Sequence, residues 1–321
     1  MRSVPQFIDQ AGSRTEDPRR ELLHALSQAR ASIPPKYFYD RLGSALFTAI
    51  CELPEYYPSR SEASIFDAHV EEIAHVVGRR ATLIDLGAGD CAKAARLFEH
   101  FDPACYVAVD ISVDFVREAL DCLQRQFPDL PMLGLGCDFS IGLSLPDSVP
   151  TGRRLFFYPG SSIGNFSPGE AVEFLRRLRH QGADQAGLLL GVDLVKAKEV
   201  VEPAYDDALG VTAAFNRNVL THVNRVAGTD FDFADWHHVA FLNEAESRIE
   251  MYLQAARALD VQWAGGGRSF AAGERIHTEN SYKYRPAQVE SMLRDAGFRL
   301  ERNWTDDAGW FGVFFATVDE R

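Results

Sequence analysis

The sequence predicts an α/β protein built on a doubly wound parallel sheet, with a second, mixed α+β domain inserted into it. Short apolar runs alternate with amphipathic helix patterns from residue 81 to residue 195, and this alternation is typical of βαβ units whose strands run parallel. The alternation stops over residues 197–286, which indicates the insertion. Two strand-like segments separated by a short turn end the chain, and they predict an antiparallel hairpin that closes the sheet.

The N-terminal part of the chain reads as helices and aromatic turns. Residues 17–31 carry leucines and an alanine on one helix face, and the "IPPK" that follows ends the helix. The next segment, residues 36–66, predicts further helices around turns that contain Tyr39, Tyr56 and Tyr57. Packing is the ordinary explanation for a tyrosine in such a turn, so these three need a second reason before they count as site residues.

The predicted sheet consists of apolar runs, each followed by a helix pattern or a loop. Its strands lie within residues 81–90, 105–112, 131–139, 153–166, 186–195, 299–307 and 310–319. The helices that accompany them lie within residues 91–101, 113–127, 168–182 and 286–298. Inside the insertion, residues 202–226 predict a long helix, and "WAGGGRSFAAGE" at 263–274 predicts a glycine-rich turn between two strands.

Composition and charge argue against several classes of protein. The net charge of −13 disfavours a nucleic-acid partner, because such proteins usually present a basic patch. The chain has no apolar run long enough for a membrane span, and its N-terminus lacks the apolar core of a secretory signal. The five cysteines form no CxxC pair, which favours reduced thiols in a cytoplasmic protein over disulfides or zinc. The "WHHV" at 236–239 lacks metal-ligand spacing, so no metal site is predicted.

The loop after the first strand of the alternating region, "DLGAGD", predicts a cofactor site. Ligands of open α/β sheets bind at the carboxyl ends of the strands, and Gly87 and Gly89 let the backbone turn tightly and approach a ligand. A dinucleotide fingerprint would place a third glycine where this chain has Ala92. The loop therefore favours a cofactor without phosphates, such as S-adenosylmethionine, whose sulfonium or amino group can face an acidic residue of the loop.

Acidic residues at the tips of the next two strands favour the same cofactor. Asp110 ends the second strand, where a carboxylate can accept hydrogen bonds from both hydroxyls of a ribose. Asp138 and Phe139 follow the third strand, where an acid and an aromatic ring can bracket an adenine. A single acid would be explained as a loop residue or a helix cap, but acids at three successive tips favour binding. Lys93, in the first turn of the following helix, is a candidate for the cofactor carboxylate or simply a solvated lysine.

Long and unusual segments resemble the histidine Nα-methyltransferases of ergothioneine biosynthesis: "PPKYFYD", "LPEYYPSRSEA", "GSSIGNFSP", "DLVK", "AYDDALGVTAAFNRNVLTHVNR", "RIEMYL" and "ENSYKYRP". The resemblance implies a Rossmann-like class I methyltransferase that uses S-adenosylmethionine to convert histidine into its trimethylammonium betaine, hercynine. It also implies a substrate-binding domain made of residues 1–60 and 197–286, and a cofactor domain made of residues 61–196 and 287–321. The chain departs from its relatives in "DLGAGDCAKA", where they often show a glutamate before the loop and a serine or threonine after it.

The resemblance also implies roles for individual residues. Tyr39 and Tyr56 become the candidate catalytic residues that orient the substrate amine, and their rings suit cation–π contact with a growing quaternary ammonium. Asn165 and Tyr205 offer an amide and a hydroxyl to the substrate carboxylate. Asn216 and Arg217, in "FNRN", are polar positions on an otherwise amphipathic helix and are expected only to support residues that touch the substrate. In full, the implied cofactor contacts are Gly87, Lys93, Asp110, Asp138 and Phe139, and the implied histidine contacts are Tyr39, Tyr56, Asn165, Tyr205, Met251, Glu279 and Ser281.

The stretch "RIHTENSYKYRP" at 275–286 predicts a strand that is too polar on both faces to be a half-buried core strand. Regular alternation places His277, Glu279, Ser281 and Lys283 on one face. Glu279 and Ser281 can meet the two nitrogens of one imidazole, and Met251 can supply soft apolar contact to the ring. The sequence therefore predicts that this strand lines the pocket for the histidine side chain.

Two other functions stay open from the sequence. The same chemistry could act on tryptophan or tyrosine, although an unpaired Glu279 carboxylate facing an apolar ring would be costly. A dehydrogenase or nucleotide-binding module could use the same frame, although Ala92 replaces the third glycine that it would need. A non-catalytic binding protein fits less well with a complete set of site residues. The expected partner is a small molecule, without nucleic acid or membrane, and the default oligomeric state is a monomer.

Overall fold

The computed structural model describes residues 4–10, 17–182 and 186–319, and the chain divides into two compact units. Each unit has its own sheet and is assembled from segments that lie far apart in the sequence. No helix within the described ranges has the length and apolar character needed to cross a membrane. Unit 1 comprises Met1–Gly12, Pro58–Val195 and Lys283–Arg321, and unit 2 comprises Ser13–Tyr57 and Lys196–Tyr282.

Unit 1 is built on an eight-stranded sheet with the strand order β1-β4-β3-β2-β5-β6-β13-β12. Strands β1 to β6 run parallel to one another, and β13 lies antiparallel between β6 and β12. The inner strands are buried almost throughout, because helices cover both faces of a parallel sheet. The strands are β1 Gln6–Asp9, β2 Thr82–Leu86, β3 Cys105–Asp110, β4 Met132–Gly136, β5 Arg154–Tyr158, β6 Gly187–Asp193, β12 Phe298–Thr305 and β13 Phe311–Val318.

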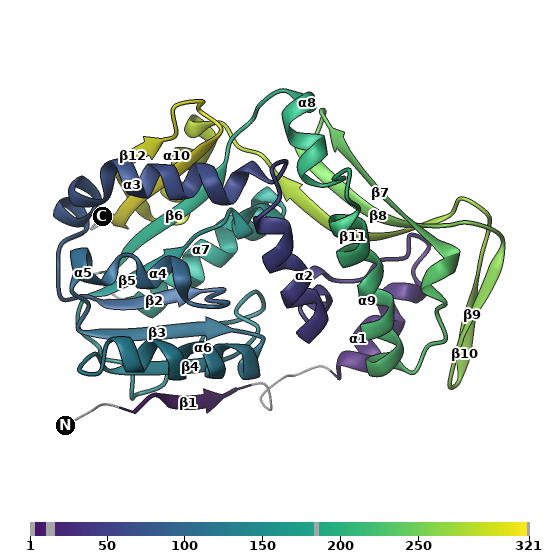
Figure 1. Cartoon of the computed structure of the whole chain (residues 1–321), viewed down its shortest axis with the longest axis horizontal. Coiled ribbons are helices and arrows are strands. Elements are labelled where there is room, and N and C mark those ends of the chain that lie inside the picture. Colours follow the sequence, from purple (N-terminus) through teal and green to yellow (C-terminus); the bar gives the residue numbers. More distant parts are fainter. Residues whose placement is uncertain (1–3, 11–16, 183–185, 320–321) are drawn as a thin grey trace. The chain divides into compact units, whose positions relative to one another are not determined.

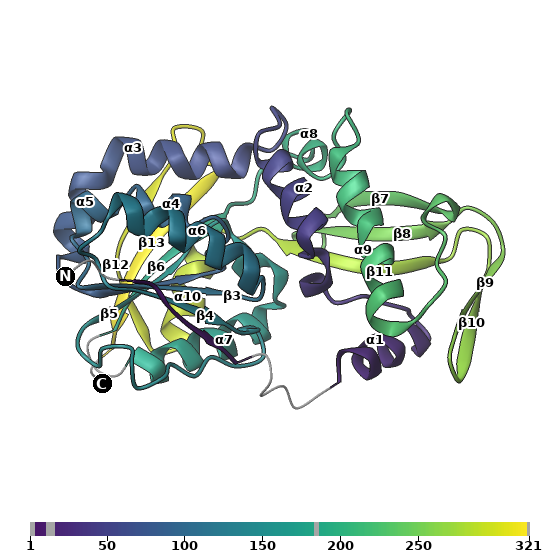
Figure 2. The ribbon, with the colours of Figure 1, turned by 60° about the horizontal axis from the view of Figure 1, so that its bottom comes forward.

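Helices cover the two faces of this sheet, as Figures 1 and 2 show. The helices α3, α4, α5 and α6 lie over one face, and α7 and α10, which contact each other, lie over the other. The apolar side of α3 enters the core through Ile65, Ile73 and Val77, which are almost fully buried. The helices are α3 Tyr57–Val77, α4 Ala92–Ala95, α5 Phe98–Phe101, α6 Val113–Gln126, α7 Pro168–Gly182 and α10 Pro286–Asp295, with the 3₁₀ turn η3 Ser162–Asn165.

The predicted doubly wound sheet and its C-terminal hairpin are confirmed, with Phe298 of β12 opposite Val318 of β13. The helix expected over residues 91–101 is divided into α4 and α5. The Leu97 N–H bonds the Ala94 carbonyl three residues earlier, and this tighter turn interrupts the α-helical pattern. The strand β1 was not predicted. It pairs with β4 and therefore belongs to unit 1, whereas residues 1–60 were expected in the other domain.

Unit 2 is built on a three-stranded antiparallel sheet with the strand order β11-β8-β7. The long helix α9 packs against β7 and β8, and it also contacts α1, α2 and η2 (Figure 1). The glycine-rich segment forms the hairpin between β9 and β10, with Gly266 opposite Trp263. The elements are α1 Pro18–Ser27, η2 Pro35–Phe38, α2 Arg41–Cys51, α8 Lys198–Val201, η5 Glu202–Ala204, α9 Val211–Ala227, η6 Phe233–Asp235, β7 Trp236–Asn243, β8 Arg248–Ala255, β9 Leu259–Trp263, β10 Gly266–Phe270 and β11 Arg275–Tyr282.

The strand β11 does not keep the regular alternation expected from the sequence. His277 pairs with Tyr252 of β8, and Glu279 pairs with Met251, the next residue of β8. Thr278 is therefore an extra residue, a β-bulge, at this point of the ladder. Since neighbouring residues of β8 point to opposite faces, the bulge places His277 and Glu279 on opposite faces as well.

The expectation that His277 shares a face with Glu279 is therefore wrong, and the bulge is the reason. On its own face, the His277 ring bonds the Asn280 side chain, with 2.9 Å between Nε2 and Oδ1. Beyond the bulge the alternation is regular, so Glu279 and Ser281 do share a face. Lys283 lies past the end of β11 and belongs to unit 1.

Candidate active site

In unit 1, candidate cofactor residues gather at the carboxyl ends of β2, β3 and β4. Asp110 of β3 lies opposite Gly136 of β4, and the Gly87 N–H bonds the Val109 carbonyl at 2.8 Å. Gly87 has a φ of 74°, and a Cβ at this position would meet the Phe139 ring at 3.8 Å. The structure thus brings the glycine loop, Asp110 and Phe139 to one edge of the sheet.

Asp110 fastens the glycine loop to the start of the next helix. Its Oδ2 accepts the Gly89 N–H at 3.0 Å, and its Oδ1 accepts the Ser112 N–H at 2.8 Å. Burial raises the pKa of the Asp110 carboxyl, and the two backbone N–H groups act against that rise. Each carboxylate oxygen has a second lone pair, so Asp110 can still accept hydrogen bonds from the hydroxyls of a ribose.

Asp138 and Phe139 are anchored within their own loop. The Ser140 backbone N–H donates to Asp138 Oδ1 at 3.2 Å, and the Ser140 hydroxyl bonds the same oxygen, which makes a turn typical of aspartate. The Phe139 ring lies edge-on to Tyr158 and tilted against Phe174, with 5.9 Å between ring centroids in both pairs. Both residues are half-buried, so part of each remains available to a ligand.

Asp85 is a buried carboxyl at the end of β2, directly before the glycine loop. The Tyr106 hydroxyl donates to its Oδ2 at 2.8 Å, while its Oδ1 has no hydrogen-bond partner among the described residues. Burial raises the pKa of Asp85 to about 7, even though the Tyr106 bond lowers it. The exposed acid of the loop is Asp90, whose side chain accepts the Ala92 N–H at 3.0 Å and starts α4.

Lys93 is held by Glu62, a residue that was not predicted from the sequence. Glu62 lies on α3 and is only 2% exposed. The Lys93 Nζ lies 2.6 Å from Glu62 Oε2, and the Gly160 N–H donates to Glu62 Oε1 at 2.8 Å. One carboxylate thus joins α3, α4 and the loop after β5. No periodicity or motif in the sequence connects these three segments, so only the fold reveals the contact.

We expect Glu62→Gln to weaken the binding of S-adenosylhomocysteine about fivefold, or about 1 kcal/mol. The glutamine can still accept the Gly160 N–H, but it removes the negative charge that orients the Lys93 ammonium. Isothermal titration calorimetry measures the change. Glu71→Gln is the matched control, because Glu71 is an exposed residue of the same helix that faces His100. Equal affinities for Glu62→Gln and the control would contradict the role given to Glu62.

In unit 2, the candidate tyrosines form a connected aromatic cluster. The rings of Tyr56 and Tyr205 meet edge to face with centroids 6.4 Å apart. Phe47 contacts Tyr56 at 6.1 Å and Tyr39 at 5.8 Å, again edge to face. The Tyr205 hydroxyl lies 2.7 Å from Ser281 Oγ on β11. The cluster therefore connects the turn before α3, the segment after η5 and the polar face of β11.

Glu279 and Met251 lie opposite each other on the same face of the unit 2 sheet. Both are buried, at 9% and 2% exposure, so a carboxylate and a thioether share an interior surface. Burial raises the pKa of Tyr56 well above that of a free phenol, and the nearby Tyr205 and Glu279 raise it further. Tyr56 therefore remains a protonated phenol across the neutral range.

Asn165 belongs to unit 1, whereas the other candidate substrate residues belong to unit 2. It ends η3, the turn that follows β5, and β5 pairs with β2 in the sheet. Its loop therefore starts at the same edge of the sheet as the glycine loop. The loop is tied to β6, because the Asp193 N–H donates to Ser161 Oγ at 2.8 Å.

Asp40 fixes the start of α2, directly after the candidate catalytic residue Tyr39. Its Oδ1 accepts the Gly43 N–H and the Asn218 side-chain amide, both at 2.8 Å, so that it caps α2 and ties it to α9. Burial alone would raise the pKa of Asp40. The two hydrogen bonds and the nearby His222 and Arg225 outweigh burial and lower the pKa below its usual value.

We expect Asp40→Asn to destabilise the protein by about 1 kcal/mol near pH 7. The folded-state pKa is lowered, so the aspartate contributes stability above its unfolded-state pKa and loses it as pH falls through the folded value. The difference between the two proteins should therefore shrink as the solution is acidified below the usual aspartate pKa. Urea unfolding at several pH values measures it. A difference that stays constant down to acid pH would contradict the contribution of the charge.

The fold and the carboxyl-edge residues together define a class I methyltransferase that depends on S-adenosylmethionine. The glycine loop and acids lie at the carboxyl ends of parallel strands, and an antiparallel strand is inserted between β6 and β12. The profile of the family described as histidine-specific methyltransferases, SAM-dependent, matches residues 18–318. The chain belongs to this family.

Individual relatives agree with the family. The histidine N-alpha-methyltransferase of Mycolicibacterium smegmatis is 42% identical over 95% of this chain and 96% of that protein. The histidine N-alpha-methyltransferase of Mycobacterium tuberculosis is 40% identical over 93% of this chain and 94% of that protein. The ergothioneine biosynthesis protein 1 of Neurospora crassa is 29% identical over 85% of this chain, which spans 32% of that longer protein.

Proposed function

We propose that the protein transfers three methyl groups from S-adenosylmethionine to the α-amine of L-histidine, giving hercynine as the first step towards ergothioneine. The observation that carries the proposal is the buried pair of Glu279 and Ser281 on one face of β11, with Met251 opposite Glu279. A carboxylate and a hydroxyl at this spacing suit the two nitrogens of an imidazole, and a thioether suits the face of its ring. The family membership and the names of the closely similar relatives support the same substrate.

The residues at the carboxyl edge of unit 1 fit S-adenosylmethionine. Asp110 retains acceptor lone pairs for the ribose, Phe139 offers a ring to the adenine, and Asp138 offers a carboxylate beside it. Lys93, oriented by Glu62, is the candidate for the carboxylate of the cofactor. When bound, the cofactor would supply a methyl group on its sulfonium, for in-line attack by the substrate amine with S-adenosylhomocysteine as the leaving group.

Tyr39 and Tyr56 are assigned to the amine of the substrate. The amine arrives largely protonated, with a pKa of about 8 or above, and must lose a proton before it can accept a methyl group. Tyr56 keeps its own proton, because burial raises its pKa. Its Oη can accept a hydrogen bond from the amine and orient it, while water takes the proton away. The aromatic rings then stabilise the growing quaternary ammonium through cation–π contact.

Asn165 and Tyr205 are assigned to the substrate carboxylate. The Asn165 side chain offers amide N–H donors, and the Tyr205 hydroxyl, which lies 2.7 Å from Ser281 Oγ, offers a further polar group. This arrangement lets a single hydroxyl pair connect the site for the carboxylate with the site for the ring. For the surroundings of the enzyme we propose the cytoplasm and a monomeric state. The five cysteines form no CxxC pair, which supports a reducing compartment.

A substrate comparison tests the proposal. The protein is incubated with S-adenosylmethionine and, separately, L-histidine, L-tryptophan or L-tyrosine, and the release of S-adenosylhomocysteine is followed. We expect release with histidine and background rates with the other two, because neither an indole nor a phenol ring presents two nitrogens to Glu279 and Ser281. Release with tryptophan or tyrosine alone would favour the alternative substrate, and release with none of the three would overturn the proposal.

A further inference from the structure

The buried side chain of His238 on β7 holds the backbone of Tyr205. His238 is 2% exposed at its side chain, and its Nε2 lies 2.8 Å from the Tyr205 carbonyl oxygen. Its Nδ1 lies 2.8 Å from Asn216 Nδ2 of α9, which also bonds the Tyr252 carbonyl at 3.0 Å. A carbonyl can only accept and an amide nitrogen only donates, so His238 is the neutral tautomer with its proton on Nε2.

Burial favours this neutral form of His238. It lowers the pKa of the ring, although the Tyr205 carbonyl and the acids Asp206 and Asp207 act in the opposite direction. Asn216 completes the arrangement, because its amide supplies the donor that a neutral Nδ1 requires. The pair of His238 and Asn216 thus forms a fixed line of hydrogen bonds from α9 through β7 to the backbone of Tyr205.

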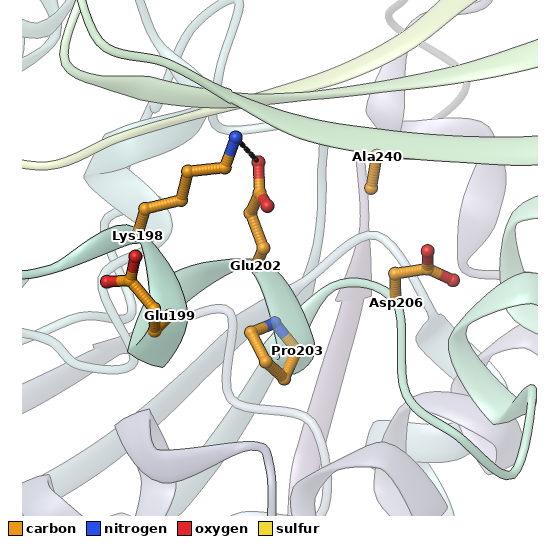
Figure 3. A pocket seen from close by; sticks show the side chains of 6 residues that line it. All are labelled: Lys198, Glu199, Glu202, Pro203, Asp206 and Ala240. Atoms are coloured by element: carbon orange, nitrogen blue, oxygen red, sulfur yellow. Dashed lines mark ion pairs between the residues drawn. The ribbon is translucent and has the colours of Figure 1, made fainter.

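A second hydrogen bond fastens the same segment to β7. The Leu242 N–H donates to Glu202 Oε1 at 2.8 Å, and the Tyr205 N–H bonds the Glu202 carbonyl at 2.9 Å. Residues within 198–206 and Ala240 of β7 line a pocket (Figure 3). The hydrogen bonds of His238 and Leu242 thus lie on either side of Ala240 along β7. The pocket is lined by Lys198, Glu199, Glu202, Pro203, Asp206 and Ala240.

We propose that His238, supported by Asn216, is a positioning residue for histidine binding, and this inference rests on the proposed function. The Nε2–H bond fixes the Tyr205 backbone so that the Tyr205 hydroxyl stays 2.7 Å from Ser281 Oγ. The two hydroxyls then meet the substrate as one preorganised pair. Neither His238 nor Asn216 needs to touch the substrate for this effect.

Kinetics of His238→Leu test the proposal. We expect the KM for histidine to rise about fivefold, as for one lost hydrogen bond, with kcat and the affinity for S-adenosylhomocysteine within about twofold of the parent. His238→Gln should restore the KM, because its amide can donate to the Tyr205 carbonyl and accept from Asn216. His237→Leu, an exposed neighbour on the other face of β7, is the matched control. An unchanged KM in His238→Leu, or no restoration by glutamine, would overturn the proposal.

A double-mutant cycle separates positioning from general support of the fold. If His238 acts through the Tyr205 hydroxyl, His238→Leu should add little to the KM once Tyr205→Phe has removed that hydroxyl. If the increases in KM from His238→Leu and from Tyr205→Phe multiply in the double variant, the two residues act independently, and the proposal is contradicted. If His238→Leu does not fold, His238→Asn replaces it in the cycle, since asparagine is too short to reach the Tyr205 carbonyl. If the unmutated protein methylates another amino acid instead of histidine, the proposed function is wrong. The same double-mutant cycle, measured as the KM for that amino acid, still tests the role of His238.

Discussion

Asp110→Asn is expected to weaken the binding of S-adenosylhomocysteine about 100-fold, which corresponds to about 2.7 kcal/mol. The Asp110 carboxylate accepts two backbone N–H groups in the structure and is assigned the two ribose hydroxyls as well. Asparagine offers one acceptor oxygen, and its amide N–H groups would face a backbone N–H donor. Hydrogen bonds to a charged group contribute about 1.5–3 kcal/mol each, so the loss should exceed that of a neutral contact.

Isothermal titration calorimetry with purified protein measures this change. Asp121→Asn, on the exposed side of α6, removes the same charge away from the loop and is expected to bind normally. A melting curve of each variant without ligand shows whether the glycine loop still folds. An Asp110→Asn protein that melts like the parent and binds S-adenosylhomocysteine equally well would show that Asp110 does not hold the cofactor.

Glu279→Ala is expected to lower kcat/KM for histidine at least about tenfold, or about 1.4 kcal/mol. The carboxylate is assigned to an imidazole N–H inside a buried surface, where alanine leaves that donor without an acceptor. The binding of S-adenosylhomocysteine should not change, because Glu279 is not among the residues assigned to the cofactor.

The matched control for Glu279 is Glu244→Ala, which removes an exposed carboxylate from the turn between β7 and β8. Initial rates with histidine and with tryptophan should be measured for all three proteins. We expect the ratio of histidine to tryptophan turnover to fall only in Glu279→Ala, because that variant alone lacks the acceptor assigned to the imidazole N–H. An unchanged kcat/KM for histidine in Glu279→Ala would remove Glu279 from the site.

The cofactor site at the carboxyl ends of the parallel strands could be located from the sequence, because each of its residues directly follows a strand that the sequence predicts. Parallel strands end at the same edge of the sheet, so Gly87, Asp110 and Asp138 had to lie near one another once the strands were placed. The C-terminal hairpin could also be predicted from the sequence, since only a short turn separates β12 from β13. By contrast, the early strand β1 is four residues long and pairs with β4, far along the chain.

The residues that were missed depend on contacts between distant segments. Glu62 meets Lys93 only because α3 packs over the same face as α4, and the segments share no pattern in the sequence. The bulge at Thr278 shifted the face of His277, and a strict period of two cannot reveal an extra residue. The "WHHV" segment offered only the absence of metal-ligand spacing, and the contacts of His238 with Asn216 and the Tyr205 carbonyl depend on the fold.

In the proposed function, the protein places three methyl groups on the α-nitrogen of histidine. The direct measurement is fragmentation mass spectrometry of histidine incubated with the protein and S-adenosylmethionine carrying a deuterated methyl group. Successive products with one, two and three labelled methyl groups, all on the α-nitrogen, are the predicted result. Label on an imidazole nitrogen, or histidine that stays unlabelled while another amino acid gains label, would contradict the account.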